Sequence, residues 1–178
     1  MFGSYENFPE TVHCIASFNF QGSAKNVQQA IFYVFHKLNY EVHDLGAVTP
    51  YLKQKCDVSF EFGVAEEDAF NFLDEKELDQ CLRCITEKKF QTLDFFFIIR
   101  YHIIKGSGER VPLRFDYHVL RLVFQDDCFE MRIRHEKGTQ RIQLDDLTDF
   151  IVKQINAEIY RKRLNPLVLA YFEKIGLQ

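Results

Sequence analysis

Hydrophobic and polar residues alternate most strictly between Leu93 and His135, which is the pattern of β-strands with one buried face. Two turn-forming stretches, residues 105–110 and 125–127, divide this region into three strands. The register that groups like residues predicts a core face made of Phe95, Phe97, Ile99, Tyr101, Ile103, Val111, Leu113, Phe115, Tyr117, Val119, Phe129, Met131 and Ile133. The sequence therefore predicts a three-stranded antiparallel meander.

Apolar residues recur at helical spacing in the segments before and after the meander. The helical segments are predicted at residues 23–38, 66–73, 74–88, 145–161 and 166–176. A further strand is expected at residues 11–20, where apolar and polar residues again alternate. These elements predict an α+β fold, in which a mostly antiparallel sheet has its meander in the C-terminal half of the chain and helices packed mainly on one face.

The length and composition predict one globular domain over residues 1–178. No Pro-, Gly- or Ser-rich linker and no internal repeat divides the chain. The formal charge is only −4, from 22 Lys and Arg against 26 Asp and Glu, which excludes a disordered chain or a basic nucleic-acid tail. No apolar run of about 18 residues and no secretory leader is present, so we expect a cytoplasmic protein without a membrane partner.

The cysteines do not indicate a metal site or a disulfide framework. Their number, five, is odd, and we expect reduced thiols. Cys81 and Cys84 form a CxxC pair, but no second pair or suitably spaced histidines accompany it. We therefore expect no metal and no cofactor, and no stretch contains a motif specific enough to name a family or a reaction.

Strand pleating places charged residues on the face opposite the predicted core. These residues are Arg100, His102, Arg114, Asp116, His118, Glu130, Arg132 and Arg134. One interpretation is a solvated face with cross-strand ion pairs. Another is a surface that binds an anionic partner, either nucleic acid or a phosphate-containing ligand, through Arg100, Arg114, Arg132 and Arg134. We take the second as the working hypothesis, for a binding or accessory protein that is not an enzyme.

Two alternatives remain beside this hypothesis. A small enzyme could use His118 or His102 as a general base, with Asp116 to orient it and Arg100 nearby, although no nucleophile is evident. A homodimeric interaction scaffold could instead form through the apolar C-terminal helices. The sequence leaves open whether the charged face is open, pocketed or covered.

Overall fold

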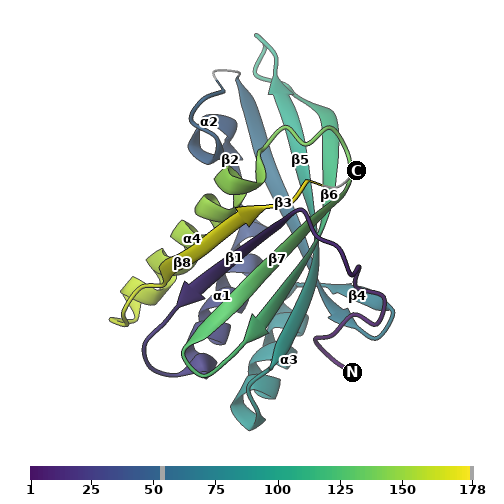
Figure 1. Ribbon diagram of the computed structural model, residues 1–178. Helices are drawn as coiled ribbons and strands as arrows, with labels where there is room; N and C mark the ends of the chain where they lie inside the picture. Colours follow the sequence, from purple (N-terminus) through teal and green to yellow (C-terminus); the bar gives the residue numbers. More distant parts are fainter. Residues whose placement is uncertain (53–54, 177–178) are drawn as a thin grey trace.

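The computed structural model describes residues 1–52 and 55–176. In these residues the chain forms a single sheet of eight strands with four helices. The strands are β1 (Cys14–Asn19), β2 (Val42–Asp44), β3 (Cys56–Glu66), β4 (Ala69–Phe72), β5 (Thr92–Ile104), β6 (Arg110–Phe124), β7 (Cys128–Lys137) and β8 (Val168–Lys174). The helices are α1 (Ala24–Leu38), α2 (Leu45–Val48), α3 (Glu75–Glu87) and α4 (Leu144–Arg161). The strand order is β2-β3-β5-β6-β7-β1-β8, every neighbouring pair is antiparallel, and β4 pairs with the end of β3 (Figure 1). The predicted α+β fold and its β5-β6-β7 meander are thus confirmed.

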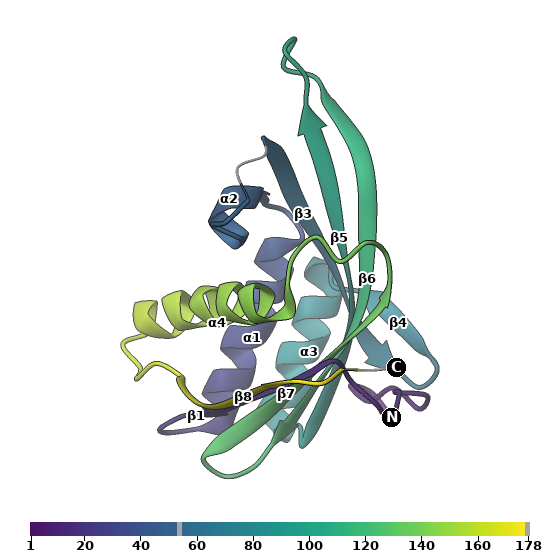
Figure 2. The same ribbon diagram turned by 45° about the horizontal axis from the view of Figure 1, so that its top comes forward.

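The helices gather on one face of the sheet, here called the inner face (Figure 2). Helix α1 is capped at its N-terminus by Ser23, whose side chain accepts a hydrogen bond from the amide of Lys25. Phe35 of this helix stacks on Phe62 of β3, with ring centroids 4.2 Å apart, and meets Phe95 of β5 edge to face at 4.9 Å. Each such buried ring stabilises the fold by roughly 1.5–3 kcal/mol, so the inner aromatic layer fixes the helices on this face.

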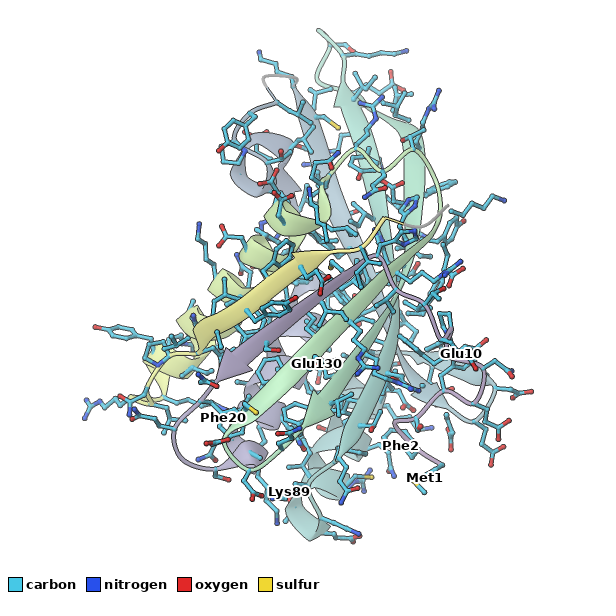
Figure 3. The ribbon with its side chains drawn as sticks, viewed as in Figure 1. Met1, Phe2, Glu10, Phe20, Lys89 and Glu130 are labelled. Atoms are coloured by element: carbon cyan, nitrogen blue, oxygen red, sulfur yellow. The ribbon has the colours of Figure 1, made fainter. Side chains whose placement is uncertain are left out.

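The opposite face, here called the outer face, is partly covered by the N-terminal strap, residues 2–11. The strap begins where β3 and β5 diverge: the amide of Gly3 donates to the carbonyl of Ala65 at 2.7 Å, and its carbonyl accepts from the amide of Asp94 at 2.7 Å. The start of the chain therefore fills the gap that β3 leaves when it turns to pair with β4. Figure 3 labels Phe2 and Glu10 on this segment, beside the strands of the sheet.

A buried ion pair fastens the strap to the sheet. The carboxylate of Asp94 is fully buried and accepts two hydrogen bonds of 2.8 Å from the guanidinium of Arg121. It also accepts a hydrogen bond of 2.7 Å from the amide of Tyr5. The same guanidinium lies 4.3 Å from the ring centroid of Phe8, in a cation–π contact. Asp94 and Arg121 of the sheet thus hold Tyr5 and Phe8 of the strap.

Two predicted helices are wrong. Residues 66–73 form the turn at Glu67, whose φ is 57°, followed by β4, which pairs with β3. The predicted last helix, residues 166–176, is the strand β8, which pairs along its length with β1. Local apolar spacing favours a helix in both segments, but pairing with a distant strand satisfies the backbone and overrides this preference.

The predicted core face is correct for β5 and β7 but inverted along most of β6. Near the hairpin loop Ile103 pairs with Val111, as the sequence predicts, but further on Tyr101 pairs with Arg114 and His102 with Pro112. Leu113 is therefore an extra residue in β6, a β-bulge, and it reverses the alternation of every residue that follows. Phe115 is 45% exposed as a result. The bulge turns Asp116 and His118 onto the inner face.

The described residues include no helix long and apolar enough to cross a membrane. All five cysteines are free thiols, and Cys81 of the CxxC pair is fully buried on α3.

We predict that Asp94→Asn lowers the free energy of unfolding by about 3 kcal/mol, because it leaves the Arg121 guanidinium without its buried counter-charge. Urea denaturation at neutral pH measures this. Asp149→Asn is the matched control, because its ion pair with Lys153 is solvent-exposed and should change stability by less than about 0.5 kcal/mol. Equal effects of the two substitutions would contradict an anchoring role for Asp94.

Candidate ligand-binding site on the outer face

A row of five aromatic rings crosses the outer face, here called the outer aromatic row. Its members, in spatial order, are Tyr5 of the strap, Phe70 of β4, Phe96 of β5, and Tyr117 and Phe115 of β6. Successive ring centroids lie 4.7, 5.6, 5.8 and 6.1 Å apart. The rings are in mutual contact yet only partly buried, so they form an apolar surface that is accessible to a ligand.

The strap and four rings of the outer aromatic row border an open groove of about 950 Å³, here called the outer pocket. Tyr5, Asn7, Pro9 and Thr11 form its wall on the strap side. Its floor on the sheet is made of Phe70, Phe96, Tyr117 and Val119. This volume is within the range of small-molecule sites, and the floor is mostly apolar, whereas the strap and the end of β7 supply the polar groups.

The charged groups of the outer pocket lie at the end of β7, where Arg134, Glu136 and Lys137 line it. The guanidinium of Arg134 donates to the carbonyl of Thr11 at 3.0 Å and to its hydroxyl at 2.7 Å, and it lies 3.5 Å from the carboxylate of Glu136. These contacts orient Arg134 at the pocket wall. With two cations and one anion, the pocket lining has an excess of positive charge.

The four arginines predicted to bind an anion do not form one cluster. Arg100 pairs with Glu61 at 2.8 Å and lies 6.0 Å from the ring of Phe115, at the end of the outer aromatic row. Arg132 pairs with Glu130 on the outer face, and Arg114 is exposed beside the bulge. Of the four, the structure places Arg134 in the outer pocket, and the others lie outside it.

The predicted catalytic candidates lie apart from this site. His102 is on the outer face, opposite Asp57 of β3, whereas Asp116 and His118 are buried on the inner face. Neither Asp116 nor His118 lines the outer pocket. Arg100, which the enzyme hypothesis groups with them, is on the other side of the sheet.

Asp116 is an anchor for the loop between β7 and α4. Its carboxylate accepts hydrogen bonds from the hydroxyl of Tyr101 at 2.6 Å and from the amide of Gln140 at 2.7 Å, and it lies 2.9 Å from Nε2 of His135. Burial by itself raises the pKa of Asp116, but the hydrogen bonds from Tyr101, His135 and Gln140 outweigh burial and hold the pKa below its ordinary value. These partners saturate the carboxylate, which explains why a charged group is stable in the core.

The loop approaches Asp116 so closely that it requires a glycine. Gly138 has a φ of 118°, and a Cβ built there would lie 2.2 Å from a carboxylate oxygen of Asp116 and 2.4 Å from the carbonyl oxygen of Phe115. Both the backbone conformation and the lack of space exclude a side chain. The bend at Gly138 is thus the point where the loop closes over the inner face.

His118 packs as an aromatic residue rather than as an acid or base. Its ring stacks on Phe97, with centroids 4.5 Å apart and planes 8° from parallel, and it meets the ring of His135 at 5.1 Å. Within residues 1–52 and 55–176, no hydrogen-bond partner reaches its buried Nδ1. Burial, reinforced by the neighbouring His135, lowers the pKa of His118 to about 3, so the ring is neutral at physiological pH.

Most of the outer pocket does not follow from the sequence pattern. Tyr5 lies in a segment without clear periodicity, Phe70 lies in a segment with helical spacing, and simple alternation assigns Tyr117 to the core. The sequence does contain one sign of this site: Phe96 and Ile98 are apolar, although they alternate with the core residues of β5 and therefore lie on the opposite face of the strand. A strand with apolar residues on both faces indicates that its second face is also covered or in use.

Comparisons of this chain with family models, with curated proteins and with solved structures find no match. In the described part of the chain, no group of three or more His, Cys, Asp or Glu side chains is placed to hold a metal ion. Function must therefore be inferred from the geometry of the outer face.

We predict that Gly138→Ala destabilises the protein by about 2–4 kcal/mol, because the methyl group would strain the backbone and displace Asp116 from its partners. Chemical denaturation at pH 7 gives the measurement. Gly106→Ala is the control: its surroundings are open and its φ is ordinary, so it should be close to neutral. A Gly138→Ala protein as stable as the control would show that the loop does not close over Asp116 as described.

A second prediction concerns the pH dependence of stability. The unfolded chain protonates His118 near pH 6.5, whereas the folded chain does so near pH 3. Below pH 6.5 the unfolded state thus binds one more proton at this residue, which lowers stability by up to about 1.4 kcal/mol per pH unit as pH falls toward 3. His118→Phe, which keeps the stack on Phe97, should reduce the slope by this amount. The measurement is the free energy of unfolding of the wild type and of His118→Phe from pH 7 to 4. The same slope in both proteins would contradict a buried, neutral His118.

Proposed function

We propose that the protein is a non-enzymatic binding protein whose outer pocket binds an anionic ligand with a flat aromatic part. Nucleotides and short single-stranded nucleic acids are the class that fits this description. The observation on which the proposal rests is the outer aromatic row with Arg134 and Lys137 at its side. A base can stack on an accessible ring of a sheet face, while a phosphate takes the neighbouring cation.

The dimensions of the site support a ligand of a few ring units. The outer aromatic row spans the strap, β4, β5 and β6, so more than one planar group can contact it. The strap bounds one side, which favours a flexible single strand over a stiff duplex. The Arg100 side chain at the far end of the row offers a second position for a phosphate.

The charge around the site limits the affinity that phosphates can contribute. Glu61 and Glu136 partly neutralise Arg100 and Arg134, and the net charge of the chain is negative. Stacking on the rings, at about 1–3 kcal/mol per base, must therefore contribute more than counterion release does. We accordingly expect moderate affinity with a shallow dependence on salt.

A small enzyme around His118, Asp116 and Arg100 has less support. Asp116 is saturated by structural hydrogen bonds, His118 is enclosed, and Arg100 faces away from both. A general base must reach the substrate proton within hydrogen-bond distance, and neither inner-face residue borders the outer pocket.

We predict that a labelled single-stranded oligonucleotide of about ten bases binds more tightly than a duplex of the same sequence or a polyphosphate, because only the single strand offers free bases. Tyr117→Leu should weaken binding about tenfold through the loss of one stacking ring. Lys137→Gln should weaken binding less than Tyr117→Leu does. It should also reduce the slope of log affinity against log salt by about one, which corresponds to the loss of one phosphate contact. Fluorescence anisotropy at two salt concentrations measures all three.

The control is Arg161→Gln, which removes an exposed positive charge on α4 without touching the outer face. Its affinity should equal that of the wild type. The proposal fails if the wild type binds none of these ligands, or if Tyr117→Leu and Arg161→Gln bind alike. Binding of polyphosphate as tight as that of the oligonucleotide would replace it with a simple anion site.

A further inference from the structure

A second, smaller hollow adjoins the outer pocket on the outer face, and it is here called the side hollow. It has a volume of about 150 Å³ and is lined by residues of β3, β4 and β5, at the end of the sheet where β4 lies beside the strap (Figure 1). Phe70 and Phe96, two rings of the outer aromatic row, border both the side hollow and the outer pocket. A single strand with one base in the outer pocket can therefore place a neighbouring base in the side hollow.

The side hollow forms because β4 approaches β3 closely at Gly63, which pairs with Phe72. A Cβ built at Gly63 would lie 3.2 Å from the carbonyl oxygen of Asn71 and 3.3 Å from the Cβ of Phe70. Both distances are shorter than ordinary van der Waals contact, so a glycine at this position allows β4 to fold against β3. Phe70 and Phe72 thereby become walls of the side hollow, opposite Ile98 of β5.

Glu61 of β3 is the charged residue of the side hollow, whose other lining residues are apolar. One of its carboxylate oxygens, Oε2, lies 2.8 Å from Nη2 of Arg100. Among the described residues, no donor contacts the other oxygen, Oε1. Arg100 thus orients the carboxylate, and one oxygen is left to accept a hydrogen bond from a ligand.

A carboxylate repels the phosphates of a nucleic acid, so Glu61 can only favour a ligand group that donates a hydrogen bond. Among the pyrimidines, cytosine has an amino group at position 4, which donates, whereas uracil has a carbonyl oxygen there, which a carboxylate repels. A volume of about 150 Å³ has room for one six-membered ring, because a cavity of that size binds benzene. Ring size and charge therefore favour the same ligand group.

We propose, on the basis of the proposed function, that the side hollow is a base subsite in which Glu61 accepts a hydrogen bond from the 4-amino group of cytosine. The base packs between the rings of Phe72 and Phe96, and the neighbouring nucleotide occupies the outer pocket. Glu61 is then the residue that determines specificity, and Arg100 is a positioning residue that holds its carboxylate. The protein should prefer single strands that contain cytosine over those that contain uracil.

The test compares two ten-base oligonucleotides, one of deoxycytidine and one of deoxyuridine, by fluorescence anisotropy. The wild type should bind the cytosine oligonucleotide about five- to tenfold more tightly, because the two bases have the same size and Glu61 pairs only with the amino group. Glu61→Gln should bring the ratio of the two affinities to about one, because the glutamine amide can also donate to the uracil carbonyl. Circular dichroism checks that the variant is folded.

Glu130→Gln is the matched control, because Glu130 pairs with Arg132 on the outer face, is about as exposed as Glu61 and lines neither pocket. It should keep the wild-type ratio. Equal binding of both oligonucleotides by the wild type would overturn this inference and leave the proposed function intact. A preference that persists in Glu61→Gln, or that is lost in Glu130→Gln, would also overturn it. Binding of neither oligonucleotide would refute the proposed function and this inference together.

Discussion

The helices cover only one face of the sheet, and the organisation of the rest of the molecule follows from this constraint. A sheet of eight strands must bury one face and keep the other compatible with water. The inner face is the buried one, and its phenylalanines stack against α1, as Phe62 does on Phe35. The outer face is polar in part, but it also has five contacting aromatic rings, more apolar surface than a solvated face needs. The strap covers some of this surface and leaves a pocket beside it.

A single extra residue in β6 determines which side chains belong to which face. Without the bulge at Leu113, Asp116 and His118 would lie on the outer face among the arginines, where the sequence pattern places them. With it, Asp116 becomes the hydrogen-bond acceptor that closes the β7–α4 loop, and His118 becomes a neutral ring in the core. The same shift moves Tyr117 and Phe115 outward and completes the outer aromatic row. The bulge thus removes the candidate catalytic pair from the outer face and places two aromatic rings there instead.

The predictable parts of the fold depend on local information. The amphipathic spacing of α1, with Val27, Ile31 and Phe35 on one side, and the alternation of β5 follow directly from side-chain geometry. The β6 bulge does not follow, because register depends on the partner strand; Pro112, which cannot donate to a ladder, is the available sign. The strand β8 is not predictable either, since its pairing with β1 joins residues far apart in the chain. The outer pocket is not predictable from local patterns, because it forms only when the strap, the β6 bulge and β4 come together.

The measurement that tests the account most directly is an amide-resolved NMR titration of the protein with a short single-stranded oligonucleotide. The account predicts shifts confined to the strap and to the outer-face residues of β3 to β7, centred on Phe96, Tyr117 and Arg134. The amides of the loop that closes over Asp116 should not move, nor should those of β8. Shifts centred on that loop and on His118 would contradict the account, because they would place the ligand on the inner face that the helices cover.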